Sequence, residues 1–244
     1  MKCVWEHNGN DTILYAVEHV GAYARGENLD AAIAKMKAEV NAYLLWKDQT
    51  SGKDSTVEIV MEKKSDLQIA DADSDVLFDS ERAPLSRVEY EELKALALRS
   101  AEDFHRLYLS VPDKNKSCMP RRKTFYGDVP RTAAEMYEHT KNVNSYYFGE
   151  IGIDADNEGT IYECRERGFA LLEQTSGFLE NQTVEGSYGE LWSLRKMMRR
   201  FIWHDRIHAK AMYRMATKAF GNDGIANIFH FSVSSMIIEN PSVW

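Results

Sequence analysis

Residues 191–214 read LWSLRKMMRRFIWHDRIHAKAMYR, and this stretch decides the fold of the larger part of the chain. Its apolar residues recur at spacings of three and four, which predicts a long helix with one buried face. Two histidines continue the same series, so both lie on the predicted inward face, one turn apart. The series, extended by one residue, is Leu194, Met197, Phe201, His204, His208, Ala211 and Met215.

Four further motifs predict where helices begin. Each is a Ser or Thr followed three residues later by Glu, a capping box whose side chains bond to the free amides of a helix start. The pairs are Ser86/Glu89, Thr132/Glu135, Thr160/Glu163 and Ser187/Glu190. The periodic runs after them reach about residues 109, 149, 179 and 219. We therefore expect four helices that bury their apolar faces against one another in a bundle.

The segments around these helices carry helix-breaking signals. Residues 110–131 contain Pro112, Pro120 and Pro130, so we expect them to form a crossover at one end of the bundle. The glycines of FGNDG, residues 220–224, are typical of a helix stop. The apolar residues after this stop, including Phe229, are expected to cover an edge of the protein.

The first 63 residues predict a small mixed α/β domain. TILYAVEHV (residues 12–20) and STVEIVME (55–62) have the composition of strands. Between them, ARGENLDAAIAKMKAEVNAYLLW (24–46) contains an amphipathic helix that Asn28 is placed to cap. This segment resembles the strand–strand–strand–helix–strand domain of HicB-like antitoxins. The resemblance covers about residues 1–63. Because no DNA-binding appendage follows, we expect a structural or partner-docking module and not an antitoxin.

Residues 64–84, KSDLQIADADSDVLFDSERAP, are predicted to be an acidic connector with one short strand at DVLF, residues 75–78. Three alternating aspartates in it imitate the start of a calcium loop. Val76 and Arg82 stand where that loop requires Gly and Glu, so we expect solvated chain instead. The whole chain is therefore predicted to be α+β, with a mixed domain (1–63), this connector, and a helical bundle (85–244).

A third histidine lies on a predicted inward face. Met136, His139, Val143 and Tyr146 follow the same spacing of three and four in the second bundle helix. Three inward imidazoles on two helices can meet at one point, and imidazole nitrogen suits zinc, nickel, copper or iron. The alternative is that each histidine packs in the core and bonds to a hydroxyl or a carbonyl. His139, His204 and His208 are thus candidate metal ligands.

Other polar residues of these helices receive structural interpretations. Asp205 and Arg206 point away from the inward face by helical geometry, so we expect a surface ion pair. His105 lies at the edge of its helix face and is expected to be exposed or to contact a ligand indirectly. Eight basic residues on the last helix favour a solvated face paired with acidic helices, the alternative being an anionic ligand. They are Arg195, Lys196, Arg199, Arg200, Arg206, Lys210, Arg214 and Lys218.

From about Pro84 onward the chain resembles the DinB-like superfamily of metal-binding four-helix bundles. TAAEMYEHTKNVNSYYF (residues 132–148) and the quoted stretch at 191–214 carry the resemblance. It implies a divalent metal, commonly nickel or zinc, on three histidines placed like His139, His204 and His208. It also implies a thiol S-transferase that uses a low-molecular-weight thiol, with metal-dependent hydrolysis as the next reaction and a homodimer as a common state.

Composition limits the remaining function classes. A formal net charge of −8 disfavours a broad nucleic-acid surface. The small-molecule substrate that we expect is implied by the resemblance to the DinB-like superfamily. The N-terminus lacks the apolar core of a signal peptide and no apolar run is long enough for a membrane span, which predicts a cytoplasmic protein. Cys3, Cys118 and Cys164 are expected to be reduced thiols. A second hypothesis is a non-enzymatic regulatory protein that binds a metal or ligand, with a docking N-terminal domain.

Overall fold

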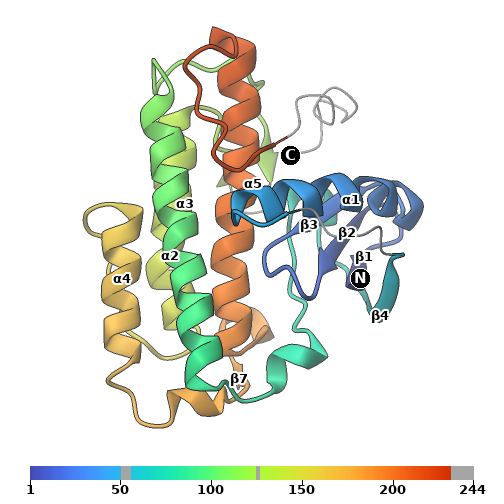
Figure 1. The fold of residues 1–244 in the computed structure, drawn as a ribbon, viewed down its shortest axis with the longest axis vertical. Coiled ribbons are helices and arrows are strands. Elements are labelled where there is room, and N and C mark those ends of the chain that lie inside the picture. Colours follow the sequence, from blue (N-terminus) through green and yellow to red (C-terminus); the bar gives the residue numbers. More distant parts are fainter. Residues whose placement is uncertain (51–55, 125–126, 232–244) are drawn as a thin grey trace. The chain divides into compact units, whose positions relative to one another are not determined.

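A computed structural model describes residues 1–50, 56–124 and 127–231 of the chain (Figure 1). It has mixed α and β structure, and the predicted α+β class is confirmed. The chain forms two compact units: the first contains Met1–Phe78 and the described residues from Ile228, and the second is Asp79–Asn227. The division therefore falls inside the predicted connector. Residues 232–244, part of the predicted bundle domain, lie outside the described residues.

The first unit contains a four-stranded sheet and one long helix. Its strands are β1 (Lys2–His7), β2 (Thr12–Ala16), β3 (Tyr23–Gly26) and β4 (Glu58–Lys64), in the order β3-β2-β1-β4. β1 and β2 pair antiparallel, as do β2 and β3, whereas β4 runs parallel to β1. Helix α1 (Leu29–Trp46) packs on β2 and β3, and Asn28 caps it by accepting a bond from the Ala31 amide.

Both predicted strand segments of this unit are longer than the strands that form. The first is limited to β2 and the second begins at Glu58, while position 55 lies outside the described residues. Pairing stops where the chain turns after Ala16, since a strand persists only where a neighbour supplies its bonds. The strand predicted at residues 75–78 is wrong, because that segment forms no strand. It is nonetheless packed: Phe78 is buried and its ring lies 5.5 Å from that of Tyr15.

Two short 3-10 turns, η1 (Ile69–Asp71) and η2 (Asp79–Arg82), interrupt the predicted connector. The connector is less solvated than its acidic composition predicts. Ser74 is buried and donates a 2.5 Å bond to Glu6 of β1, which is also buried. A buried carboxylate requires such donors, and here the connector supplies them. The segment up to Phe78 is therefore part of the first unit.

The second unit consists mainly of the helices α2 (Arg87–Ser110), α3 (Ala133–Gly149), α4 (Ile161–Leu172) and α5 (Leu194–Phe220), seen packed together in Figure 1. α5 packs on α2 and α3, and α4 also packs on α2 and α3. The capping boxes at Ser86, Thr132 and Thr160 are confirmed, each with both of its bonds present. α4 ends seven residues earlier than predicted, before Gly177 takes a positive φ of 72°.

The fourth predicted capping box is wrong. Ser187 begins only the 3-10 turn η4 (Ser187–Gly189), inside a hairpin formed by β7 (Val184–Glu185) and β8 (Leu191–Trp192). Tyr188 has a φ of 62°, which no continuous helix allows. α5 begins instead after Ser193, whose hydroxyl accepts a bond from the Lys196 amide. The Ser187/Glu190 motif does not reveal that the residues on either side of it pair with each other as strands.

Among its described residues, the segment between α2 and α3 contains no helix and forms the two-residue strands β5 (Lys123–Thr124) and β6 (Gly127–Asp128). α5 ends at Phe220 and Gly221 caps it, as the helix-stop motif predicts. Beyond it, Phe229 is buried and lies 5.2 Å from the ring of Trp46 in the first unit. Within the described ranges, no helix combines the length and the apolar character that a membrane span needs.

Candidate metal centre

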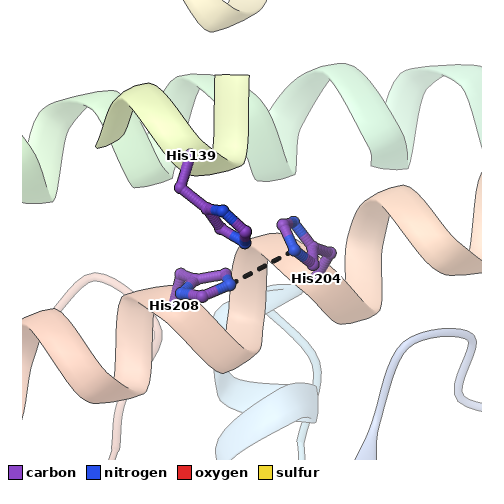
Figure 2. A group of neighbouring side chains, drawn as sticks. All are labelled: His139, His204 and His208. Carbon is purple, nitrogen blue, oxygen red and sulfur yellow. Dashed lines mark hydrogen bonds between the residues drawn. The ribbon is translucent and has the colours of Figure 1, made fainter. Parts of the chain in front are cut away.

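Three histidines from two helices meet in the second unit. His204 and His208 lie one turn apart on α5, and His139 approaches them from α3 (Figure 2). One nitrogen of each ring lies within 4.8 Å of a nitrogen of each other ring. The Nε2 atoms of His204 and His208 are 3.2 Å apart. The structure thus brings together all three residues that the sequence singles out as candidate ligands.

The ring arrangement is compact but leaves the rings unstacked. The centroid of His139 lies 5.2 Å from that of His204 and 4.7 Å from that of His208. The rings of His204 and His208 are steeply inclined to each other, at 67°. One nitrogen of each ring approaches the other two rings between α3 and α5, as the nitrogens of a ligand set would around one ion.

Burial keeps these imidazoles neutral. It lowers the pKa of His204 well below the usual value, and the nearby His208, His139, Arg200 and Arg165 lower it further. Burial also lowers the pKa of His208 well below the usual value, with a contribution from His139, and it lowers the pKa of His139. A neutral imidazole has a free lone pair, so all three rings are in the form that binds a metal.

The three side chains differ in accessibility. The rest of the predicted inward series on α5 is buried, but His204 and His208 keep partial exposure. The prediction that His139 lies on an inward stripe is wrong in part, because His139 and Tyr146 are exposed. The face that α3 buries is rotated by about one residue and contains Met136, Tyr137, Thr140, Asn144, Tyr147 and Phe148. His139 stands at its margin, so the cluster is open on that side.

The inner nitrogens of the two α5 histidines are unsatisfied within the described chain. The Nδ1 atoms of His204 and His208 are buried, and no atom of a described residue bonds to either of them. The interpretation of these residues as core histidines bonded to hydroxyls or carbonyls therefore lacks the partners it requires. Within the described residues, these two rings bond to each other through their Nε2 atoms.

Asp205 lies next to His204 but belongs to a different cluster. It is fully buried and accepts two bonds from Arg165 of α4, at 2.6 and 3.0 Å. Burial raises the pKa of Asp205 and the Arg165 charge opposes that rise. The predicted surface pair of Asp205 and Arg206 is therefore wrong, since both residues are fully buried. α5 is packed on several sides. A prediction that assumes one buried helix face therefore places Asp205 and Arg206 at the surface when they are buried.

The predicted solvated basic face of α5 is also wrong in part. Lys196 and Arg199 are buried, at 0% and 3% exposure. Lys196 pairs with Glu190 at 2.8 Å, and Arg199 forms a two-pronged ion pair with Glu81. The expected acidic partners do exist, but they lie in the segments that precede α2 and α5. A buried cation needs such a partner, which explains the pairs.

The remaining histidines and cysteines lie elsewhere. His105 is half-buried and its ring lies 5.3 Å from that of Tyr137. His7 bonds to Glu62 on the sheet, and the ring of His19 lies 5.6 Å from that of Tyr43. The cysteines are free, and burial raises the pKa of Cys3 to about 11. The described part of the chain thus places one histidine cluster, on α3 and α5.

Sequence reasoning missed two residues beside the cluster. Arg200 lies one turn before His204, and the ring of Tyr147 is 6.0 Å from the ring of His204. Arg200 lies over Tyr147, with its Cζ 5.5 Å from the ring centroid. The available signal was the spacing of four between Arg200, His204 and His208, which places all three on one side of α5.

Comparison with known proteins adds no relative. No family model matches the chain, and no curated protein or solved structure is similar to it.

Proposed function

We propose that the second unit is a DinB-like four-helix bundle in which His139, His204 and His208 hold one divalent ion, nickel or zinc. The observation that carries the proposal is the convergence of three imidazoles from two helices, with ligand nitrogens within 4.8 Å of one another. An all-nitrogen set favours metals of this class over magnesium or calcium, which prefer oxygen ligands.

The distances fit the proposed ion. Two nitrogens bound to one zinc at 2.0–2.1 Å with tetrahedral geometry are about 3.3 Å apart. The Nε2 atoms of His204 and His208 are already 3.2 Å apart. A hydrogen bond between the two rings would have the same length. The third ring favours the ion.

The proposed reaction is the transfer of a low-molecular-weight thiol to an electrophilic small molecule, with hydrolysis as the second choice. A divalent ion on three neutral imidazoles keeps its full charge and can ionise a thiol or water near neutral pH. The lowered histidine pKa values keep the three rings unprotonated, so that they act as ligands and not as proton carriers. The exposed side of His139 gives a substrate its approach.

We also propose a HicB-like identity for the first unit, on the strength of its order β1-β2-β3-α1-β4. This unit supports the alternative function, a regulatory protein that senses a metal or ligand with its helical unit and docks a partner with its sheet unit. The chain divides into two compact units, as a protein with separate sensing and docking parts requires. Cytoplasmic localisation and a homodimeric state stay predictions.

Metal analysis tests the proposal. Purified protein loaded with Ni²⁺ or Zn²⁺ and then dialysed is expected to hold one ion per chain. His204→Ala is expected to lose it, while His105→Ala removes an imidazole outside the cluster and keeps it. An unchanged metal content in His204→Ala would overturn the site. Consumption of a thiol with a panel of electrophiles then separates the enzyme from the regulatory protein.

A further inference from the structure

A pocket of about 610 Å³ lies between the C-terminal end of α3 and the β7–β8 hairpin, within the second unit. Its walls are formed by residues of the segments 145–152 and 184–187. Pockets that bind small organic molecules have volumes of about 300–1,000 Å³. None of the three clustered histidines lines this pocket. It is therefore large enough for a small molecule and separate from the candidate metal centre.

The charged side chains in the pocket wall are both acidic. Glu150 and Glu185 line the pocket, and none of its lining residues is a lysine, an arginine or a histidine. The pocket also lies at the C-terminal end of α3, where the helix dipole adds partial negative charge. A wall of this sign attracts cations and repels carboxylates and phosphates. The ligand expected for this pocket is therefore a cation.

Glu150 is buried without a cation. It is 7% exposed, and its Oε2 atom accepts a 2.6 Å bond from the Ser187 amide. Within the described part of the chain, no basic side chain pairs with Glu150, and its Oε1 atom makes no hydrogen bond. A buried carboxylate normally has a countercharge and a donor for each oxygen. In the pocket wall, one oxygen is thus available to accept a bond from a ligand.

The hairpin encloses this carboxylate closely. A methyl group on Gly186 would lie 1.7 Å from Glu150 Oε2 and 2.8 Å from the ring of Trp192. Any side chain at position 186 would therefore push the carboxylate or the ring away. The glycine lets the backbone of the hairpin approach Glu150 and donate the Ser187 bond, which fixes the carboxylate in the wall.

Tyr146 lines the same pocket from α3. Burial raises the pKa of its hydroxyl, and the nearby Glu150 charge raises that pKa further. Tyr146 therefore stays neutral and presents an aromatic ring close to a carboxylate. Aromatic faces attract ammonium groups, and more strongly where water is excluded. Val184 and Ile151 add apolar surface to the wall, which suits a carbon chain.

We propose that this pocket binds an aliphatic amine, whose ammonium group donates to Glu150 Oε1 and whose carbon chain lies against Tyr146 and Val184. An ammonium group has one positive charge and three donors, so it satisfies the free oxygen and balances the buried carboxylate in one contact. Glu185, which is exposed in the same wall, provides an acidic group for the second amine of a diamine. The inference does not depend on the metal-dependent function.

The test follows the Gly186 and Ser187 amides by NMR in the ¹⁵N-labelled full chain. The protein is first treated with a chelator and dialysed, so that an amine cannot bind a metal at the histidine cluster. The probes are 1,4-diaminobutane and 1,4-butanediol, which has the same length without the charges. We expect the diamine to reach half-saturation at a concentration at least about tenfold lower, because hydrogen bonds between charged groups are the strong ones. Equal half-saturation would contradict the inference, and this comparison needs no variant.

Variants locate the preference for the diamine. Glu150→Gln keeps an oxygen that can accept the Ser187 bond and is expected to remove the preference. Glu158→Gln removes the same charge at an exposed position outside the pocket wall and is expected to retain it. A preference that survives in Glu150→Gln would show that the amine binds elsewhere. Ca²⁺ that shifts the same amides at a lower concentration than the diamine would identify an inorganic-cation site and overturn the inference.

Discussion

Two polar clusters lie side by side on α5 and differ in how they are completed. Asp205 is buried, and Arg165 of α4 satisfies it with two bonds. His204, its neighbour in sequence, shares a bond with His208, and its buried Nδ1 bonds to no described residue. Both oxygens of the buried carboxylate have a partner within the chain, and we call this the complete cluster. In the imidazole cluster two buried Nδ1 atoms have no partner among the described residues, and we call it the incomplete cluster. We therefore expect the first cluster to contribute to stability, and we propose the second as the metal site.

Removing a partner from the complete cluster should have the largest effect. Asp205→Ala leaves Arg165 buried and uncompensated, so we expect the free energy of unfolding to fall by about 3–5 kcal/mol. Urea denaturation followed by circular dichroism measures this. Asp156→Ala is the matched control, since it breaks an exposed pair with Arg167 and should cost far less. Equal losses in both variants would show that burial does not distinguish the pairs.

Removing a histidine of the incomplete cluster should leave the metal-free protein nearly as stable as the wild type. It should also abolish the stabilisation that a bound metal ion provides. At a free Ni²⁺ concentration of 100 times Kd, the wild type should gain about 2.7 kcal/mol. His208→Ala should gain much less, because the site loses one of its three proposed ligands. Thermal melts with and without Ni²⁺ measure the difference. If His208→Ala lost much stability in the absence of metal, His208 would stabilise the fold, as Asp205 is expected to do.

Two serine hydroxyls before α5 differ in the same way: one caps the helix and the other does not. Ser193 is buried and caps α5, so Ser193→Ala should destabilise the protein by about 1 kcal/mol. Ser187→Ala removes the hydroxyl of the fourth predicted box, which caps no α-helix, and should change the stability by less than about 0.5 kcal/mol. Paired urea midpoints test both. The reverse order would mean that the helix begins at the box after all.

The smallest expected effect concerns a charge satisfied at the surface. Bonds from the Ser86 amide and hydroxyl, together with Arg195, lower the pKa of Glu89 from 4.5 to about 2. A lowered folded-state pKa means stability that is complete above pH 4.5 and is lost as the pH falls toward 2. Glu89→Gln should flatten the decline of the urea midpoint across that window. An identical decline in both proteins would show that the capping charge contributes nothing.

Local signals predicted a large share of the helical unit. The boxes at Ser86, Thr132 and Thr160 start α2, α3 and α4 where expected, because the cap and its partner lie within one turn of each other. The helix stop after Phe220 is confirmed for the same reason. Ser187 is the exception: strand pairing across the β7–β8 hairpin determines the residues around it, and a single turn of sequence does not contain that pairing.

For the candidate site, spacing alone placed His204 and His208 on one side of a helix. It also named His139, but not its position at an exposed margin of α3. The burial of Asp205 and Lys196 was missed, because their partners lie on other segments. In the sequence, Arg200 is not distinguished from the seven other basic residues of α5. Its distinction, the three rings that hold it beside the histidines, comes from residues distant in sequence.

The sequence by itself determined where most helices begin and end and which histidines share a helix side, because those properties depend on neighbours within about one turn. Only the tertiary structure decided which polar residues are buried with a partner and which form the candidate site. That decision depends on packing between α3, α4 and α5. Asp205 and His204 are adjacent in the chain, and the different elements facing them give them different roles.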